Sequence, residues 1–173
     1  EEIEKCSLRV LCINDGSTDN SENIIREYVE KYPFIELFSK ENGGGSDARN
    51  YGVAKAKGEW IVFLDPDDYF EPCALELLME LQKQTGARIV AGKGNDTYDH
   101  ESYQNYQLNE EILSKAILLS SEETLIEMLY GKMATVSAWA KLFPKDIVEK
   151  YPYPKGKIYE DLYVISDYLK EVE

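Results

Sequence analysis

Short apolar runs alternate with amphipathic stretches along the first half of the chain. Four of these runs have the length of β-strands: residues 10–13, 35–38, 60–64 and 88–91. The stretches between them repeat apolar residues at helical spacing; Pro33 ends the first, and Pro72 and Gly86 bound the third. Strands that alternate with helices in this way form a layered, mostly parallel sheet with right-handed crossovers. The pattern therefore predicts an α/β fold.

The pattern is less regular after residue 91. Residues 92–118 have no clear period and are interpreted as a long excursion over the surface, either an acceptor-binding lid or plain irregular structure. Ser120 with Glu123 predicts the start of a helix, and residues 136–143 predict a strand. A final helix is expected to begin at residues 160–161. The residues expected on the buried faces of these two helices are Leu125, Ile126 and Leu129, and Leu162, Ile165, Leu169 and Val172.

The apolar run at residues 60–64 ends in three acidic residues, Asp65, Asp67 and Asp68. A continuous apolar run predicts a strand buried on both faces, as in a parallel sheet covered by helices. The ligand crevice of an open α/β sheet lies beyond the carboxyl ends of its strands. Like charges repel unless a cation lies among them, and carboxylate oxygens suit Mg²⁺ or Mn²⁺. An acidic turn in solvent explains the same residues, so this motif alone leaves both interpretations open.

A run of glycines at residues 43–45 precedes the second predicted helix. Ser46 or Asp47 is expected to cap that helix, and Arg49 to project from its first turn. A glycine-rich loop that leads into a helix can receive a phosphate, although many such loops bind none. Arg49 is equally consistent with a surface arginine in an ion pair.

Composition excludes several classes of function. The chain has 173 residues, a formal net charge of −14 and a pI near 4.5. It lacks the Lys and Arg clusters that follow a phosphate backbone, so we expect no nucleic-acid partner. No apolar run reaches the length of a membrane span. The three cysteines are scattered, which predicts reduced thiols and a cytoplasmic location. His100 is the sole histidine, so a catalytic triad would depend on that residue.

Five segments taken together resemble the inverting family 2 glycosyltransferases of GT-A fold, and they occur in that family's order. They are I-N-D-G-S-T-D at residues 13–19, N…A-R-N-x-G at 42–52, F-L-D-P-D-D at 63–68, W-A-K-L-F at 139–143 and E-D at 160–161. The resemblance implies a GT-A layered α/β/α fold, a nucleotide-sugar donor that is usually UDP-linked, and Mg²⁺ or Mn²⁺. It also implies a saccharide or lipid-linked acceptor and a role in polysaccharide biosynthesis, with peripheral association at the inner face of the membrane.

The resemblance also implies roles for single residues. Asp15 matches the aspartate that hydrogen-bonds the nucleotide base, and Arg49 matches the position that helps to hold the nucleotide. Asp65 and Asp67 match the D-x-D motif, with Asp65 near the ribose and Asp67 on the metal and diphosphate. Asp161 matches the catalytic base, with Glu160 in support.

The chain departs from the family pattern at its beginning. Members usually start with a V-S-V-I-I-P-x-Y-N strand that lies at the centre of the sheet, and a helix follows it; both are missing here. We therefore expect one domain over residues 1–173 that is shortened at its N-terminus, with acceptor-side elements beyond Glu173. A gap is expected between the strands that begin at Val10 and Trp60. The chain is then a fragment, an internally shortened form, or a protomer whose gap a second copy fills.

Two other functions remain open at this stage. The missing strand favours a glycosyltransferase-like module that has lost activity and serves in binding or assembly. An apolar strand that ends in D-x-D also occurs in haloacid-dehalogenase-like phosphatases, which place it at their first strand. In this chain the motif follows the third strand, and Tyr69 stands near the place where those enzymes need Thr or Val.

Overall fold

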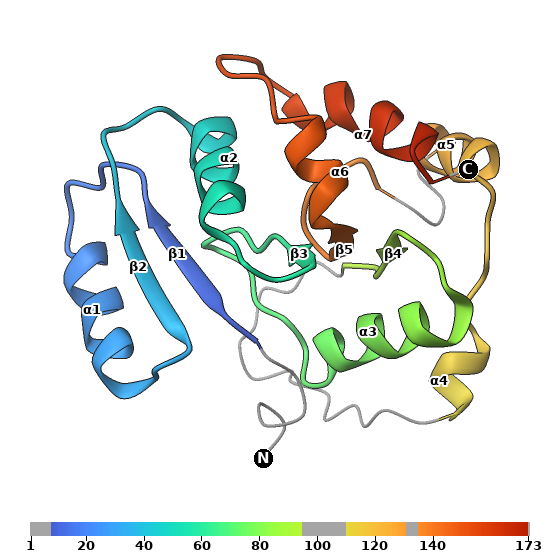
Figure 1. Cartoon of the computed structure of the whole chain (residues 1–173), viewed down its shortest axis with the longest axis horizontal. Coiled ribbons are helices and arrows are strands. Elements are labelled where there is room, and N and C mark those ends of the chain that lie inside the picture. Colours follow the sequence, from blue (N-terminus) through green and yellow to red (C-terminus); the bar gives the residue numbers. More distant parts are fainter. Residues whose placement is uncertain (1–7, 95–109, 131–134, 173) are drawn as a thin grey trace.

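The first part of the chain forms a two-stranded parallel sheet with one helix beside it. The computed structural model describes residues 8–94, 110–130 and 135–172; His100 and residues 95–109 of the expected excursion lie outside these ranges. β1 (Val10–Asn14) pairs in parallel with β2 (Ile35–Ser39) in register from Val10↔Ile35 to Asn14↔Ser39. The connecting helix α1 (Ser21–Lys31) packs mainly against β2 (Figure 1).

The second sheet differs from the expected parallel arrangement. It holds β3 (Trp60–Val62), β4 (Val90–Ala91) and β5 (Lys141–Pro144) in the order β3-β5-β4, and β5 runs antiparallel to both neighbours. The expectation of a mostly parallel sheet is therefore wrong for this half. The apolar run of β5 is compatible with a parallel or an antiparallel strand. Its direction depends on the end of the sheet at which the chain enters β5, which the run itself does not encode.

Helices cover the second sheet on two sides, which confirms the layered α/β class. The helices that follow β2 along the chain are α2 (Gly45–Lys55), α3 (Ala74–Thr85), α4 (Glu110–Ser114), α5 (Ser121–Tyr130), α6 (Lys145–Lys150) and α7 (Glu160–Lys170). In Figure 1, α3 lies below the sheet, whereas α6 and α7 lie above it. Helix α2 packs against both β1 and α6, so it joins the two halves of the molecule.

The strands β1 and β3 belong to different sheets within the described residues, as the expected gap requires. Strand β3 is correspondingly short, and its side chains are half-buried rather than covered on both faces. Leu64, which was expected to continue this strand, is exposed.

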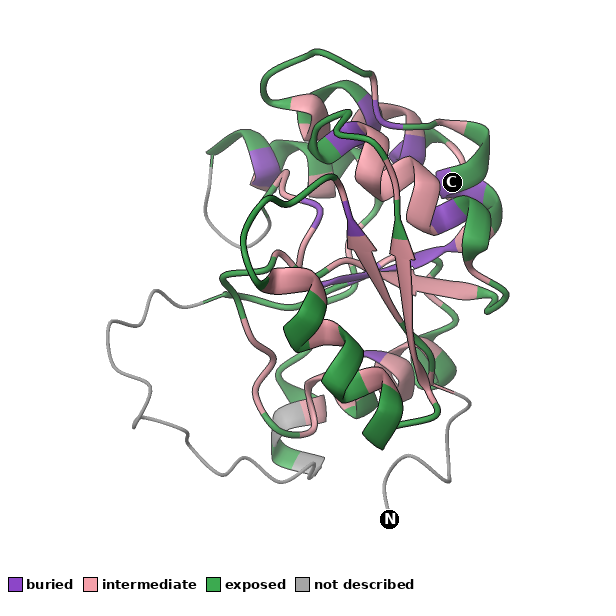
Figure 2. Ribbon diagram, turned by 90° about the vertical axis from the view of Figure 1, so that its left-hand side faces the viewer, coloured by how far each residue is buried: buried purple, intermediate pink, exposed green. Residues whose placement is uncertain are grey.

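The hydrophobic core is centred on β5, α6 and α7 instead of on β3. Phe143, Ile147 and Val148 are fully buried, and the ring of Phe143 packs edge-on against that of Tyr168 with centroids 5.4 Å apart. Tyr153 packs perpendicular to Phe63 at 5.6 Å. Figure 2 shows buried segments gathered in the upper part of the molecule, where these elements meet. Helix α1, by contrast, contains no buried residue.

Several helices begin or end at the residues predicted from the sequence, but the predicted buried faces of α5 and α7 differ from those in the structure. Ser120 and Glu123 form a reciprocal capping box before α5, with N–H···O distances of 2.8 and 3.2 Å, and Gly86 ends α3 at φ +70°. The residues expected to be buried on α5, Leu125, Ile126 and Leu129, are exposed, and Met128 is buried instead. Leu162 of α7 is also exposed, whereas Ile165 and Leu169 are buried as predicted.

None of the helices within the described residues combines the length and apolar character that a bilayer span requires. Cys12 is a half-buried free thiol, and Cys6 lies outside the described residues.

Candidate active site

Residues from three separate segments meet at the guanidinium group of Arg49. This side chain projects from the first turns of α2 and donates to Asp65 Oδ1 at 3.1 Å, just beyond β3. It also pairs with Glu160 and lies 3.7 Å from Asp161 Oδ1, both in the first turn of α7. The sequence predicted a role for each of these four residues, and the structure brings them together.

Asn50, the neighbour of Arg49, holds α2 against the chain that leads into α7. Its amide donates to the carbonyl of Tyr153 at 2.8 Å and accepts from the Tyr153 N–H at 2.9 Å. The Tyr153 ring lies under the Arg49 guanidinium, 5.4 Å from its centroid. These contacts fix the distance between α2 and α7 and therefore position Arg49 against the two acids.

The carboxylate of Asp161 lies in an environment that disfavours its charge. Burial raises the pKa of Asp161, the positive charge of Arg49 lowers it, and the neighbouring charge of Glu160 raises it further, with a net upward shift. Oδ2 accepts the backbone N–H of Ala138 at 3.1 Å. Oδ1 is buried without a hydrogen-bond partner. Such an oxygen can accept a proton from a ligand, which is what a general base requires.

The residues expected to bind a metal form only part of a coordination sphere. Asp65 begins a tight turn in which its carbonyl accepts the N–H of Asp68 at 3.1 Å, and the side chain of Asp67 is exposed. Within the described ranges, no three side chains of His, Cys, Asp or Glu gather around one point that could hold an ion. One or two carboxylates together with phosphate oxygens are the usual ligands of Mg²⁺ in nucleotide sites, so Asp65 and Asp67 fit this kind of donor set.

Asp15 holds the glycine loop that leads into α2. Its carboxylate accepts the N–H groups of Gly43 at 3.0 Å and Gly44 at 2.7 Å and pairs with Lys40. Desolvation opposes the charge, but the Lys40 ammonium and these N–H groups lower the pKa of Asp15 overall. Lys40 also contacts Asp47 at 2.7 Å, so Asp47 binds lysine instead of capping α2 as expected. Gly44 occupies the cap position at φ +83°, a conformation that favours glycine.

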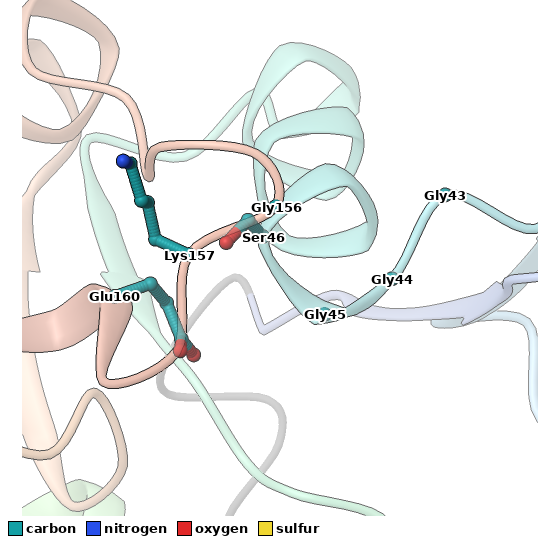
Figure 3. A pocket seen from close by; sticks show the side chains of 7 residues that line it. All are labelled: Gly43, Gly44, Gly45, Ser46, Gly156, Lys157 and Glu160. Carbon is teal, nitrogen blue, oxygen red and sulfur yellow. The ribbon is translucent and has the colours of Figure 1, made fainter.

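A small pocket lies between the glycine loop and the start of α7. Its lining residues are Gly43, Gly44, Gly45, Ser46, Gly156, Lys157 and Glu160. Figure 3 shows the loop running into α2 on one side and Gly156, Lys157 and Glu160 on the other. The ammonium of Lys157 lies 5.9 Å from the ring centroid of Tyr163. The N-terminus of α2 favours negative charge, which suits this pocket to a phosphate.

Sequence reasoning missed Ser46 as a pocket residue, Lys157, and the buried lysine Lys141. Lys157 follows Gly156, whose positive φ of +70° turns the chain toward the pocket, and a K-G-K run is the only signal of this turn. Lys141 lay within the W-A-K-L-F motif but received no role.

Comparisons with known proteins give a consistent result. The family profile described as glycosyl transferase family 2 matches residues 2–151. An uncharacterized glycosyltransferase, YibD of Escherichia coli, is 32% identical over 83% of this chain and 42% of its own length. A cholesterol galactosyltransferase of Borreliella burgdorferi is 28% identical over 93% of this chain and 47% of its own length.

The fold also matches a solved structure. The crystal structure of residues 1–349 of TarS from S. aureus superposes with a TM-score of 0.70 at 19% identity, over 93% of this chain and 45% of that 1–349 chain. TarS has also been solved with UDP-GlcNAc, where the TM-score is 0.65 at 18% identity. The chain spans less than half the length of each of these three proteins.

Proposed function

Because this chain belongs to glycosyltransferase family 2, we propose that it transfers a sugar with inversion from a nucleotide-diphosphate donor, UDP-linked, to an acceptor hydroxyl. The single observation that carries this proposal is the meeting of Arg49, Asp65, Glu160 and Asp161 in one site beside a small pocket at the start of α2. Family membership removes the phosphatase alternative. The structure of TarS with UDP-GlcNAc supports the choice of donor.

The donor diphosphate is proposed to bind at the N-terminus of α2. The N–H groups of the first turn of α2 supply positive potential at the pocket, and Lys157 lines its opposite wall. Asp15 is assigned to the nucleotide end, where it secures the glycine loop. Its two carboxylate oxygens already accept the ammonium of Lys40 and the N–H groups of Gly43 and Gly44, so a hydrogen bond from the base would replace one of these.

Asp67, with Asp65, would hold Mg²⁺ or Mn²⁺ against the diphosphate. When bound, this cation supplies positive charge that offsets the negative charge which develops on the leaving nucleotide. An acidic chain needs this compensation, since the carboxylates of the site would otherwise repel a nucleotide. Arg49 contributes fixed positive charge on the same side and holds Asp65 in place.

Asp161 is proposed as the general base. Inversion in one step requires a group opposite the leaving nucleotide to take the proton from the acceptor hydroxyl. Its Oδ1 accepts no hydrogen bond, and burial raises the pKa of Asp161, which makes its carboxylate a stronger base than that of an ordinary aspartate, whereas the charge of Arg49 favours the ionised form. Glu160 pairs with Arg49 and thereby orients the guanidinium group between the carboxylates of Asp65 and Asp161. The acceptor hydroxyl belongs to a saccharide or to a lipid-linked saccharide.

The test is release of UDP from a panel of UDP-sugars in the presence of Mn²⁺ and a mixture of saccharide acceptors. Asp161→Asn should abolish transfer and retain UDP binding, and Asp67→Asn should abolish the metal-dependent turnover. Asp167→Asn is the matched control, because Asp167 lies on the same helix and pairs with Lys170 at 2.9 Å away from the site. Transfer by the Asp161→Asn protein would overturn the assignment of the base, and failure of the wild-type chain to bind or turn over any nucleotide sugar would overturn the function.

A further inference from the structure

Lys141 is a buried lysine whose ammonium group lies close to the proposed base. It is the first residue of β5, opposite Ala91 of β4, and only 1% of its surface is exposed. Its Nζ donates to the Ser137 carbonyl at 2.7 Å, to Thr135 Oγ1 at 3.1 Å and to Ser137 Oγ at 3.4 Å. Within the described residues, none of the ion pairs shorter than 4.0 Å includes Lys141.

A buried ammonium group without a carboxylate partner is costly, so its placement calls for a reason. Burial lowers the pKa of Lys141 to about 8, while the negative charge of Asp161 raises it in part. The ammonium group of Lys141 is thus charged near neutral pH, and it interacts electrostatically with the carboxylate of Asp161 on α7.

One peptide group connects the two side chains. The Ser137 carbonyl accepts from Lys141, and the N–H of the same peptide unit, that of Ala138, donates to Asp161 Oδ2 at 3.1 Å. A peptide unit is planar, so fixing its oxygen also fixes the direction of its N–H. A cation at the oxygen further polarises the group and strengthens the N–H as a donor. Ala138 is itself buried, which keeps this connection dry.

We propose that Lys141 is a positioning residue for sugar transfer: through the Ser137–Ala138 peptide it fixes Asp161 by Oδ2 and leaves Oδ1 to take the proton from the acceptor hydroxyl. The inference rests on the proposed role of Asp161 as base. It assigns the two carboxylate oxygens different tasks, in agreement with the one hydrogen bond at Oδ2 and with Oδ1, which is buried, accepts no hydrogen bond and lies 3.7 Å from Arg49.

The primary test is Lys141→Met, which keeps an unbranched side chain of similar length and removes the charge and all donors. We expect kcat to fall by about tenfold to a hundredfold, as for other partners that orient a reacting group, while the KM for the nucleotide sugar changes less than about twofold. Lys145→Met is the matched control, since Lys145 begins α6 four residues further on and pairs with Glu149. A purely structural role for Lys141 would lower the amount of folded enzyme without this split between kcat and KM.

A spectroscopic measurement tests the connection without relying on activity. The backbone amide signal of Ala138 should shift strongly upfield in its proton dimension in Lys141→Met and remain in place in Lys145→Met, because the hydrogen bond to Asp161 weakens. An unchanged Ala138 signal, or kinetics of Lys141→Met equal to those of Lys145→Met in an active wild-type background, would overturn the inference and leave the proposed function intact. Absence of transfer by wild type, with the Ala138 shift present, would overturn the proposed function instead.

A second pair of variants covers the case in which Lys141→Met does not fold. Thr135 is exposed, and its hydroxyl accepts from Lys141. Thr135→Val removes this acceptor and should lower kcat a few-fold, by about the value of one hydrogen bond. Thr135→Ser retains the hydroxyl and should restore the wild-type rate. Equal rates for the two variants would contradict the inference.

Discussion

Replacement of Arg49 by methionine is expected to destabilise the chain more at neutral pH than at acidic pH. The guanidinium lies among three carboxylates, those of Asp65, Glu160 and Asp161, and also over the ring of Tyr153. Methionine preserves much of the packing against the ring but leaves the acids without their common cation. Each carboxylate then repels the others.

The magnitude follows from the burial of the partners. The Arg49 side chain is 18% exposed, and the three acids are exposed between 20% and 34%. Breaking a fully buried pair costs about 3–5 kcal/mol, whereas an exposed pair contributes about 0–1 kcal/mol. This half-buried site lies between these limits, so we expect a loss of about 2 kcal/mol, or about 4–8 °C in melting temperature for a chain of this size.

The pH dependence has a definite sign. Arg49 lowers the pKa of Asp161, which burial has raised, so the Arg49→Met substitution raises that pKa further. A carboxyl group whose folded-state pKa is raised contributes stability below that pKa and loses it as the pH rises. The loss in melting temperature should therefore be larger at about pH 8 than at about pH 5. Thermal unfolding followed by circular dichroism at both pH values measures it.

Arg88→Met is the control for this experiment. Arg88 pairs with Asp146 at 2.8 Å on the surface, with both side chains well exposed. Its loss should change the melting temperature little at either pH. An Arg49→Met protein that loses no stability, or loses the same amount at both pH values, would refute the view that Arg49 neutralises a carboxylate cluster.

Three further substitutions test local features of the same site. Asp161→Asn removes a desolvated charge and should raise the melting temperature at about pH 8 by about 2–4 °C while it abolishes transfer; a lower melting temperature would contradict the raised pKa. Gly43→Ala would place a Cβ 2.3 Å from Asp47 Oδ2 and should weaken both stability and UDP binding in calorimetry, whereas Gly45→Ala, with its nearest neighbour at 4.0 Å, should not. Tyr159 is 74% exposed at φ +56°, so Tyr159→Gly should relieve about 1 kcal/mol of backbone strain and raise the melting temperature, and a decrease would argue against strain.

The alternation of strands and helices could be predicted from the sequence, because it depends on local periodicity and on turn residues. The runs at β1 and β2, the end of α3 at Gly86 and the capping box before α5 are local patterns of this kind. The direction of β5 and the exposure of Leu129 depend on neighbours that are distant in the chain. An apolar stripe on α5 looks the same whether or not another element covers it.

The candidate site shows the same division. Motif resemblance led to Arg49, Asp65, Glu160 and Asp161 one at a time, but the contact of Arg49 with Asp65 spans 16 residues and that with Glu160 spans 111, and neither has a local signal. The reciprocal bonds of Asn50 with Tyr153, and the peptide between Lys141 and Asp161, involve backbone groups, whose direction the sequence does not express. The role of Lys141 could not be predicted for a further reason. Lysine is rarely fully buried, so a single lysine in an apolar run is expected at the surface.

In the proposed function, the turn after β3 and the start of α7 lie around one nucleotide and one divalent cation. Paramagnetic broadening by Mn²⁺ tests this directly on the 173-residue chain. With UDP and substoichiometric Mn²⁺, the amide signals of Asp67 and Glu160 should lose intensity, that of Glu27 on α1 should remain, and excess Mg²⁺ should restore them all. Broadening that spreads evenly over the acidic surface, that occurs equally without UDP, or that spares either Asp67 or Glu160 would contradict it.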